Sequence, residues 1–148
     1  MARCRRRTWR RLATAGLLVL ASCGAPTPGS EEDLAAQIDV IEMPHTITQL
    51  SGNYDSDCAQ GERTCPGLVR WYAATEPIEV AKLDVLGRFE TAGISVHEVS
   101  GSQIATARNE DYLYFLVFDA AMIDANPNAP AGTDFEISVT RNPESEAL

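Results

Sequence analysis

The stretch TEPIEVAKLDVLGRFETA, residues 75–92, carries the clearest secondary-structure signal in this chain of 148 residues. Its apolar side chains recur at spacings of three and four, the period of a helix with one buried face. Thr75 is a suitable N-cap, Pro77 fits the first turn, and Gly93 fits the C′ position of a Schellman cap. We therefore expect one amphipathic helix over about 76–92. Its apolar stripe consists of Ile78, Ala81, Val85, Phe89 and Ala92.

A helix with one apolar stripe needs a surface to cover, and the segments on either side of it are rich in β-branched and aromatic residues. Residues 100–102 and 109–111 are polar breaks short enough for hairpin turns, so neighbouring strands should pair antiparallel. We predict an α+β fold with one small domain over residues 31–141 and a polar tail over 142–148. Its antiparallel sheet should have about five or six strands, with the helix packed on one face. The strand candidates are Thr46–Ser51, Leu68–Ala74, Ile94–Ser100, Gln103–Arg108, Tyr112–Asp119 and Phe135–Arg141.

Three of these segments have patterns that predict their place in the sheet. Leu68–Ala74 has apolar groups on both faces, which is typical of an inner strand, and its Trp71 and Tyr72 should point in opposite directions. The run Tyr112–Phe118 is apolar on both faces and should be central. Phe135–Arg141 alternates apolar and polar residues, which fits a strand with one solvated face.

Two other segments are less regular. Glu31–Asp39 follows Ser30, a suitable N-cap, and places three acids where they favour the helix dipole, so a short helix is possible there. Residues 38–43 alternate instead, and an edge strand that ends at Pro44 is the other interpretation. Ala120–Thr133 contains two prolines and a glycine and is expected to be a long loop.

The first 22 residues are typical of an export signal. Residues 1–11 are rich in arginine, and Leu12–Ala21 is an apolar run of ten residues. Such a run rises about 15 Å as a helix, half of a bilayer core of about 30 Å, so it fits a signal peptide and not a membrane span. Arg6-Arg7 also resembles a twin-arginine signal, which leaves the export route open.

The four residues Leu20-Ala21-Ser22-Cys23 end this run and resemble the lipobox of bacterial lipoproteins. The resemblance implies that residues 1–22 are removed and that the Cys23 sulfur receives a diacylglyceryl group. It also implies a fatty acyl group such as palmitate on the freed amine, and more than one chain is what stable anchoring requires. The protein would then be lipid-anchored at the cell membrane, facing the periplasm or the cell exterior. Residues 23–30 would form the lipidated N-terminus and a flexible tether. An ordinary cleaved secretory signal is the alternative.

Two cysteines remain once Cys4 leaves with the leader and Cys23 carries lipid. They are Cys58 and Cys65, and because exported proteins fold in an oxidising compartment we predict a disulfide between them. Closing so short a loop contributes about 2–3 kcal/mol in the chain-entropy model. A structural zinc site would need a second pair of ligands.

The formal charge of the whole chain is −9 at pH 7. Residues 1–22 hold six arginines and no acid, which leaves six basic and 21 acidic residues and a charge near −15 on the rest. Such an acidic domain argues against binding to nucleic acid, because that binding depends on Lys and Arg neutralising phosphates. It also disfavours docking on an anionic bilayer, so membrane residence should come from the lipid at Cys23.

Two acidic loops, Asn53–Glu62 and Asp119–Asp134, raise the possibility of ion binding. The first begins like an EF-hand loop, but Cys58 stands where glycine is needed and Thr64 where the bidentate glutamate is needed. Residues of these types are also ordinary turn formers, which is the interpretation that we favour. No metal ligand set or cofactor site is predicted. A Ca²⁺ or small-ligand binding module remains as one alternative function.

No arrangement of nucleophile and base indicates an enzyme. His45 lies in an expected turn and His97 on an expected strand, so each is interpreted as a surface or partly buried polar residue. There is no G-x-S-x-G elbow and no phosphate-binding glycine loop. The sequence predicts a non-catalytic envelope binding or accessory protein whose sheet or loop surface contacts an unknown envelope protein or ligand. A small cell-envelope hydrolase that uses paired carboxylates is the second alternative.

Overall fold

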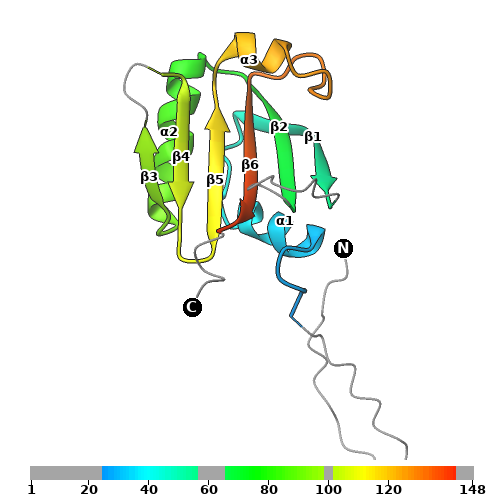
Figure 1. The fold of residues 1–148 in the computed structure, drawn as a ribbon. Coiled ribbons are helices and arrows are strands. Elements are labelled where there is room, and N and C mark those ends of the chain that lie inside the picture. Colours follow the sequence, from blue (N-terminus) through cyan, green and yellow to red (C-terminus); the bar gives the residue numbers. More distant parts are fainter. Residues whose placement is uncertain (1–24, 57–65, 99–101, 143–148) are drawn as a thin grey trace, which may run out of the picture.

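The computed structural model describes residues 25–56, 66–98 and 102–142. This part of the chain forms six strands and three helices around one core (Figure 1). In chain order they are α1 (Glu31–Asp39), β1 (Ile47–Asp55), β2 (Gly67–Ala74), α2 (Ile78–Thr91), β3 (Ser95–Glu98), β4 (Ile104–Arg108), β5 (Tyr112–Val117), α3 (Ala120–Asp124) and β6 (Phe135–Arg141).

The strands form one antiparallel sheet in the order β1-β2-β6-β5-β4-β3. The predicted α+β fold is therefore confirmed, as is the antiparallel pairing of β3, β4 and β5 through short connections. The last strand, β6, lies between β2 and β5, so residues far apart in the chain pair at the centre of the sheet. Tyr72 is opposite Phe135 and Leu116 is opposite Ile137. The inner position of β2 and the central position of β5 follow the sequence prediction.

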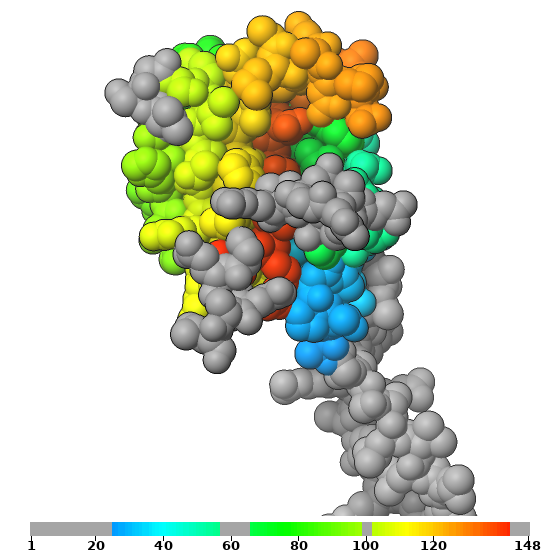
Figure 2. Space-filling model, viewed as in Figure 1, coloured from blue at the N-terminus to red at the C-terminus, as the bar shows by residue number. Residues whose placement is uncertain are grey.

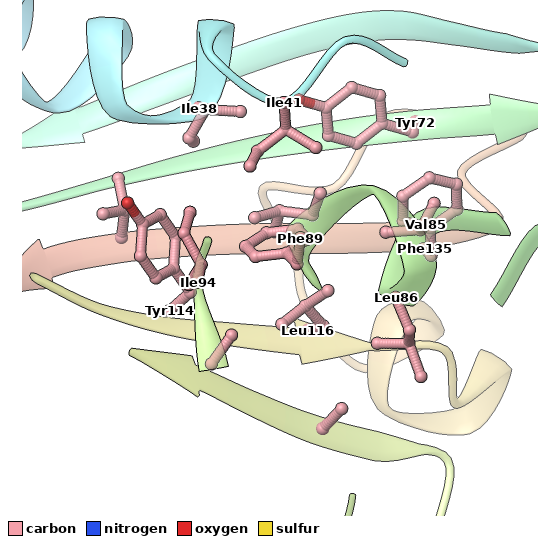
Figure 3. Packing of buried hydrophobic residues seen from close by; sticks show 14 of the residues in the cluster. Ile38, Ile41, Tyr72, Val85, Leu86, Phe89, Ile94, Tyr114, Leu116 and Phe135 are labelled. Atoms are coloured by element: carbon pink, nitrogen blue, oxygen red, sulfur yellow. The ribbon is translucent and has the colours of Figure 1, made fainter. Parts of the chain in front are cut away.

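The helix α2 packs on one face of the sheet, as predicted, and in Figure 1 it lies behind the strands. Its stripe residues Val85 and Phe89 are fully buried, and the Phe89 ring meets Tyr114 of β5 edge to face at 5.2 Å between ring centroids. Figure 3 shows Phe89 among buried side chains from α1 and the central strands. Aromatic pairs in this geometry contribute beyond their buried area.

The predicted cap of α2 is confirmed at the C-terminus of the helix and is wrong at the N-terminus. At the C-terminus Gly93 has φ +77°, and the Gly93 and Ile94 amides donate to Glu90 and Phe89, which is a Schellman cap. At the N-terminus the expected cap at Thr75 is wrong, because the Thr75 amide and hydroxyl both donate to the Thr46 carbonyl. The helix begins only after Pro77, which occupies the N-cap position without a side-chain hydrogen bond.

A second helix, α1, covers the same face of the sheet. Ser30 caps it by accepting from the Asp33 amide at 3.2 Å, and Leu34 and Ile38 belong to the same core as α2. The sequence favoured one packed helix, so the helical layer is larger than expected. The edge strand considered for residues 38–43 does not form, because α1 continues to Asp39 and the edge of the sheet is β1.

The third helix, α3, is a single short element in a segment that was expected to be loop. Asp119 caps it by accepting from the Ala121 amide at 2.9 Å, and its Ile123 is buried. The segment that follows reaches the face opposite α1 and α2, where Asn126 donates to the Glu136 carboxylate and Trp71 Nε1 donates to the same oxygen at 3.0 Å. One end of that second face is therefore covered.

Candidate binding face of the sheet

The face opposite α1 and α2, here called the outer face, carries regular rows of side chains across all six strands. Pairing in a sheet places directly opposite residues on the same face. The register gives two such rows, which we call the Phe115 row and the Leu113 row after a residue of β5 in each. The Phe115 row is His97, Thr106, Phe115, Ser138, Val69 and Asn53; the Leu113 row is Ser95, Arg108, Leu113, Thr140, Gly67 and Asp55.

The two rows are only partly covered within the described part of the chain. Phe115, Leu113 and Val69 are each half-buried, whereas Trp71 in the next row, beneath the segment after α3, is 3% exposed. Figure 2 shows α3, in orange, at the upper end of this face and the surface of β4 and β5 below it. The uncovered apolar groups therefore lie toward the end of the sheet away from α3.

Two open hollows lie on either side of Phe115. The hollow on the β1 side has a volume of about 400 Å³ and is lined by Asn53, Asp55 and Val69 among others. The hollow on the β3 side, here called the β3 hollow, has a volume of about 530 Å³. Its lining combines the apolar Leu113 and Phe115 with the polar His97, Thr106 and Arg108.

The electrostatics of the β3 hollow differ from those of the whole chain. Both His97 and Arg108 are exposed, and none of its described lining residues is acidic. The other basic residues of the described segments have partners: Arg70 pairs with Asp39, Lys82 pairs with Glu98, Arg88 donates to the Glu42 carbonyl, and Arg141 lies over the Tyr112 ring. Among the arginine and lysine residues of the described segments, Arg108 is thus the one whose side chain has no ion pair, hydrogen bond or ring contact.

A cluster of hydrogen-bonded residues, here called the entry cluster, holds the chain where it enters the domain. Its members are Gly29, Asp33, Tyr54 and Tyr112. The Gly29 amide donates to Asp33 Oδ2 at 2.7 Å, and the Tyr112 hydroxyl donates to the same carboxylate at 2.8 Å. The Tyr54 hydroxyl donates to the Gly29 carbonyl at 3.1 Å. Burial, reinforced by the hydrogen bond to Asp33, raises the pKa of Tyr112 to about 12.

The backbone at the entry point favours glycine. Gly29 has φ +78°, and a Cβ there would lie 3.2 Å from Pro66 Cγ. The segment expected to be tether therefore meets the domain at Gly29, while residues 25–28 are exposed.

The predicted site residues divide into those inside and those outside the described part of the chain. Cys23, Cys58 and Cys65 lie outside it, so the lipid attachment and the disulfide stay predictions. His45 lies in an exposed turn, as expected. His97 lies on β3, as expected, and the register brings it to the β3 hollow beside Arg108, a pairing that sequence reasoning missed. The predicted hairpins made β3 and β4 neighbours, but they did not give the register that places His97 diagonally beside Arg108.

In the described parts of the two acidic loops, acidic side chains accept hydrogen bonds from backbone amides. Asp119 caps α3, and Asp134 Oδ2 accepts from the Ala74 amide at 2.8 Å. No group of three or more His, Cys, Asp or Glu side chains is arranged to hold a metal ion within the described residues. Residues 57–62 of the Asn53–Glu62 loop lie outside the described residues, and ion binding by this loop stays a prediction.

Comparisons of the chain with protein-family models, curated proteins and solved structures found no match. Among the helices of the described segments, none has both the length and the apolar character needed to cross a membrane. The described part of the chain is an α+β domain with helices over one face of the sheet, and its described residues leave a mixed apolar and polar surface partly uncovered on the other.

Proposed function

We propose that this protein is a lipid-anchored extracytoplasmic lipoprotein that acts as a non-catalytic binding or accessory protein of the cell envelope. The anchor is Cys23, and the binding surface is the outer face of the sheet. The observation that carries the proposal is the half-buried Phe115, which stands between two hollows on a face that α1 and α2 leave uncovered.

A half-buried aromatic side chain of this kind is suited to contact a partner. Apolar area removed from water contributes about 25 cal/mol per Å², and the residues that dominate interfaces are commonly aromatic groups seated against pockets. Around Phe115 the Thr106 and Ser138 side chains supply hydroxyl groups at the same level of the sheet. A mixed lining of this kind gives a partner both apolar contact and hydrogen bonds.

The sequence supports the placement outside the cytoplasm. The lipobox-like Leu20–Cys23 follows an apolar run too short to span a bilayer, and the acidic remainder of the chain lacks the polybasic character that would draw it to anionic lipid. A lipid on Cys23 is therefore the anchor that the chain itself offers.

Site-specific photocrosslinking in cells that produce the full-length protein tests the binding surface. A photoreactive amino acid replaces Phe115 in one variant and Leu83 in the control; Leu83 is 70% exposed on α2, in the helical layer. We expect a discrete, reproducible adduct from position 115 that position 83 does not give. No adduct from position 115, or the same adducts from both positions, would contradict the proposal.

A further inference from the structure

We propose that the β3 hollow binds a carboxylate side chain of an acidic polypeptide segment, with Arg108 and His97 as the contacts for the carboxylate. An apolar side chain of the same segment packs on Leu113 and Phe115. This inference deepens the proposed function and rests on it, because it names the chemistry of the partner of the outer face.

The sheet register places the two nitrogen-bearing side chains together. Ser95 is opposite Arg108 and His97 is opposite Thr106, so His97 and Arg108 are diagonal neighbours across β3 and β4 on the same face. Diagonal neighbours have Cβ atoms within about 8 Å, a distance that long side chains span easily. Leu113 is opposite Arg108 on the other side, and Phe115 is opposite Thr106. One ligand in this hollow can therefore touch a guanidinium, an imidazole and two apolar side chains.

The charge of the side chains that line the β3 hollow favours a negatively charged ligand. The whole chain has a formal charge of −9, yet this hollow presents an unpaired arginine and no acid among its described lining residues. A guanidinium offers five N–H donors in a planar fork that matches a carboxylate with two parallel hydrogen bonds. The uncommitted Arg108 thus favours an acidic partner, whereas the acidic surface elsewhere disfavours one.

The length of the outer face favours a polypeptide over a small molecule. Neighbouring strands are about 4.8 Å apart, so the Phe115 row extends over roughly 24 Å from His97 to Asn53. Hollows lie on both sides of Phe115. An extended segment of about seven residues would span this distance, with its acidic residue at the β3 end.

Fluorescence anisotropy with the full chain in detergent tests the assignment. The probe is the labelled heptapeptide Gly-Glu-Gly-Leu-Gly-Leu-Gly, in which Glu and both Leu residues share one face when the peptide is extended, and the matched probe has Gln in place of Glu. We expect saturable binding of the Glu probe that weakens with added salt, and at least tenfold weaker binding of the Gln probe. We also expect Arg108→Gln to weaken binding of the Glu probe about tenfold, the effect of losing a charge-assisted hydrogen bond. The control Arg88→Gln removes the same charge from α2 and should bind like the unmodified protein.

Three results would overturn the assignment: no saturable binding of the Glu probe, equal binding of both probes, or equal affinity of Arg108→Gln and Arg88→Gln. Free N-acetylglutamate as competitor separates the sources of the carboxylate. If it binds as tightly as the heptapeptide, the ligand is a small carboxylate and the polypeptide assignment is wrong. These failures leave the crosslink from position 115 intact, whereas failure of the proposed function removes that crosslink.

Discussion

The carboxylate of Asp33 should be one of the most important polar groups for the stability of the domain. It is 8% exposed and accepts hydrogen bonds from the Gly29 amide and the Tyr112 hydroxyl. Asp33→Ala leaves both donors without this partner in a buried place. Hydrogen bonds to a charged group contribute about 1.5–3 kcal/mol each, and relief of the buried charge offsets part of the loss. Two bonds at the low end give a loss of about 3 kcal/mol in the free energy of unfolding.

Urea denaturation followed by tryptophan fluorescence measures this loss, because Trp71 is buried on β2. Glu32→Ala is the matched control, since Glu32 lies in the same helical turn, carries the same charge and is exposed. It should cost less than about 1 kcal/mol, the size of a dipole interaction at the surface. A double-mutant cycle with Tyr112→Phe should show that the two losses are not additive. Equal losses for Asp33→Ala and Glu32→Ala would refute the role of the entry cluster.

Three further predictions follow from the core, the entry cluster and the anchor. Phe89→Ala should lower the free energy of unfolding by about 3–5 kcal/mol, because the fully buried ring leaves a cavity against Tyr114, whereas Leu83→Ala on the exposed side of α2 should change it by less than about 0.5 kcal/mol in the same urea assay. The folded-state pKa of Tyr112 is raised to about 12 from 10.0, so its contribution to stability is complete below pH of about 10 and is lost as pH rises through about 12; Tyr112→Phe should flatten that part of the profile of urea midpoint against pH, and an unchanged profile would contradict the assignment. Cys23→Ala should release the protein from the membrane fraction or leave an unprocessed precursor, and fractionation that shows unchanged membrane residence and lipid labelling would show the lipobox interpretation to be wrong.

Local signals predicted the elements that depend on neighbours in the chain. The spacing of the apolar residues in α2 and the glycine at position 93 act within two or three turns, and the helix and its Schellman cap are where the sequence indicated. Thr75 was misjudged because a residue far away in the chain engages it: its amide donates to the carbonyl of Thr46, which directly precedes β1. A cap is a local choice that tertiary pairing can override.

The candidate site was less predictable because it depends on strand order. The sequence favoured an antiparallel sheet but not the insertion of β6 between β2 and β5. Without that order, Val69 and Phe115 have no reason to share a row, and with it Ser138 joins them. His97 was interpreted as a polar strand residue, which is correct as far as one strand can show. That Arg108 lies beside it follows only from the register of β3 and β4.

The entry cluster and the outer face together predict how a lipidated protein would stand at the membrane. Gly29 is held beside Tyr112 at the start of β5, which is the end of the sheet opposite α3. If Cys23 carries lipid, the six residues 23–28 reach at most about 20 Å at the extension of a proline-containing tether. The tethered end of the sheet would then be the end that carries the Leu113 row, and α3 lies at the other end.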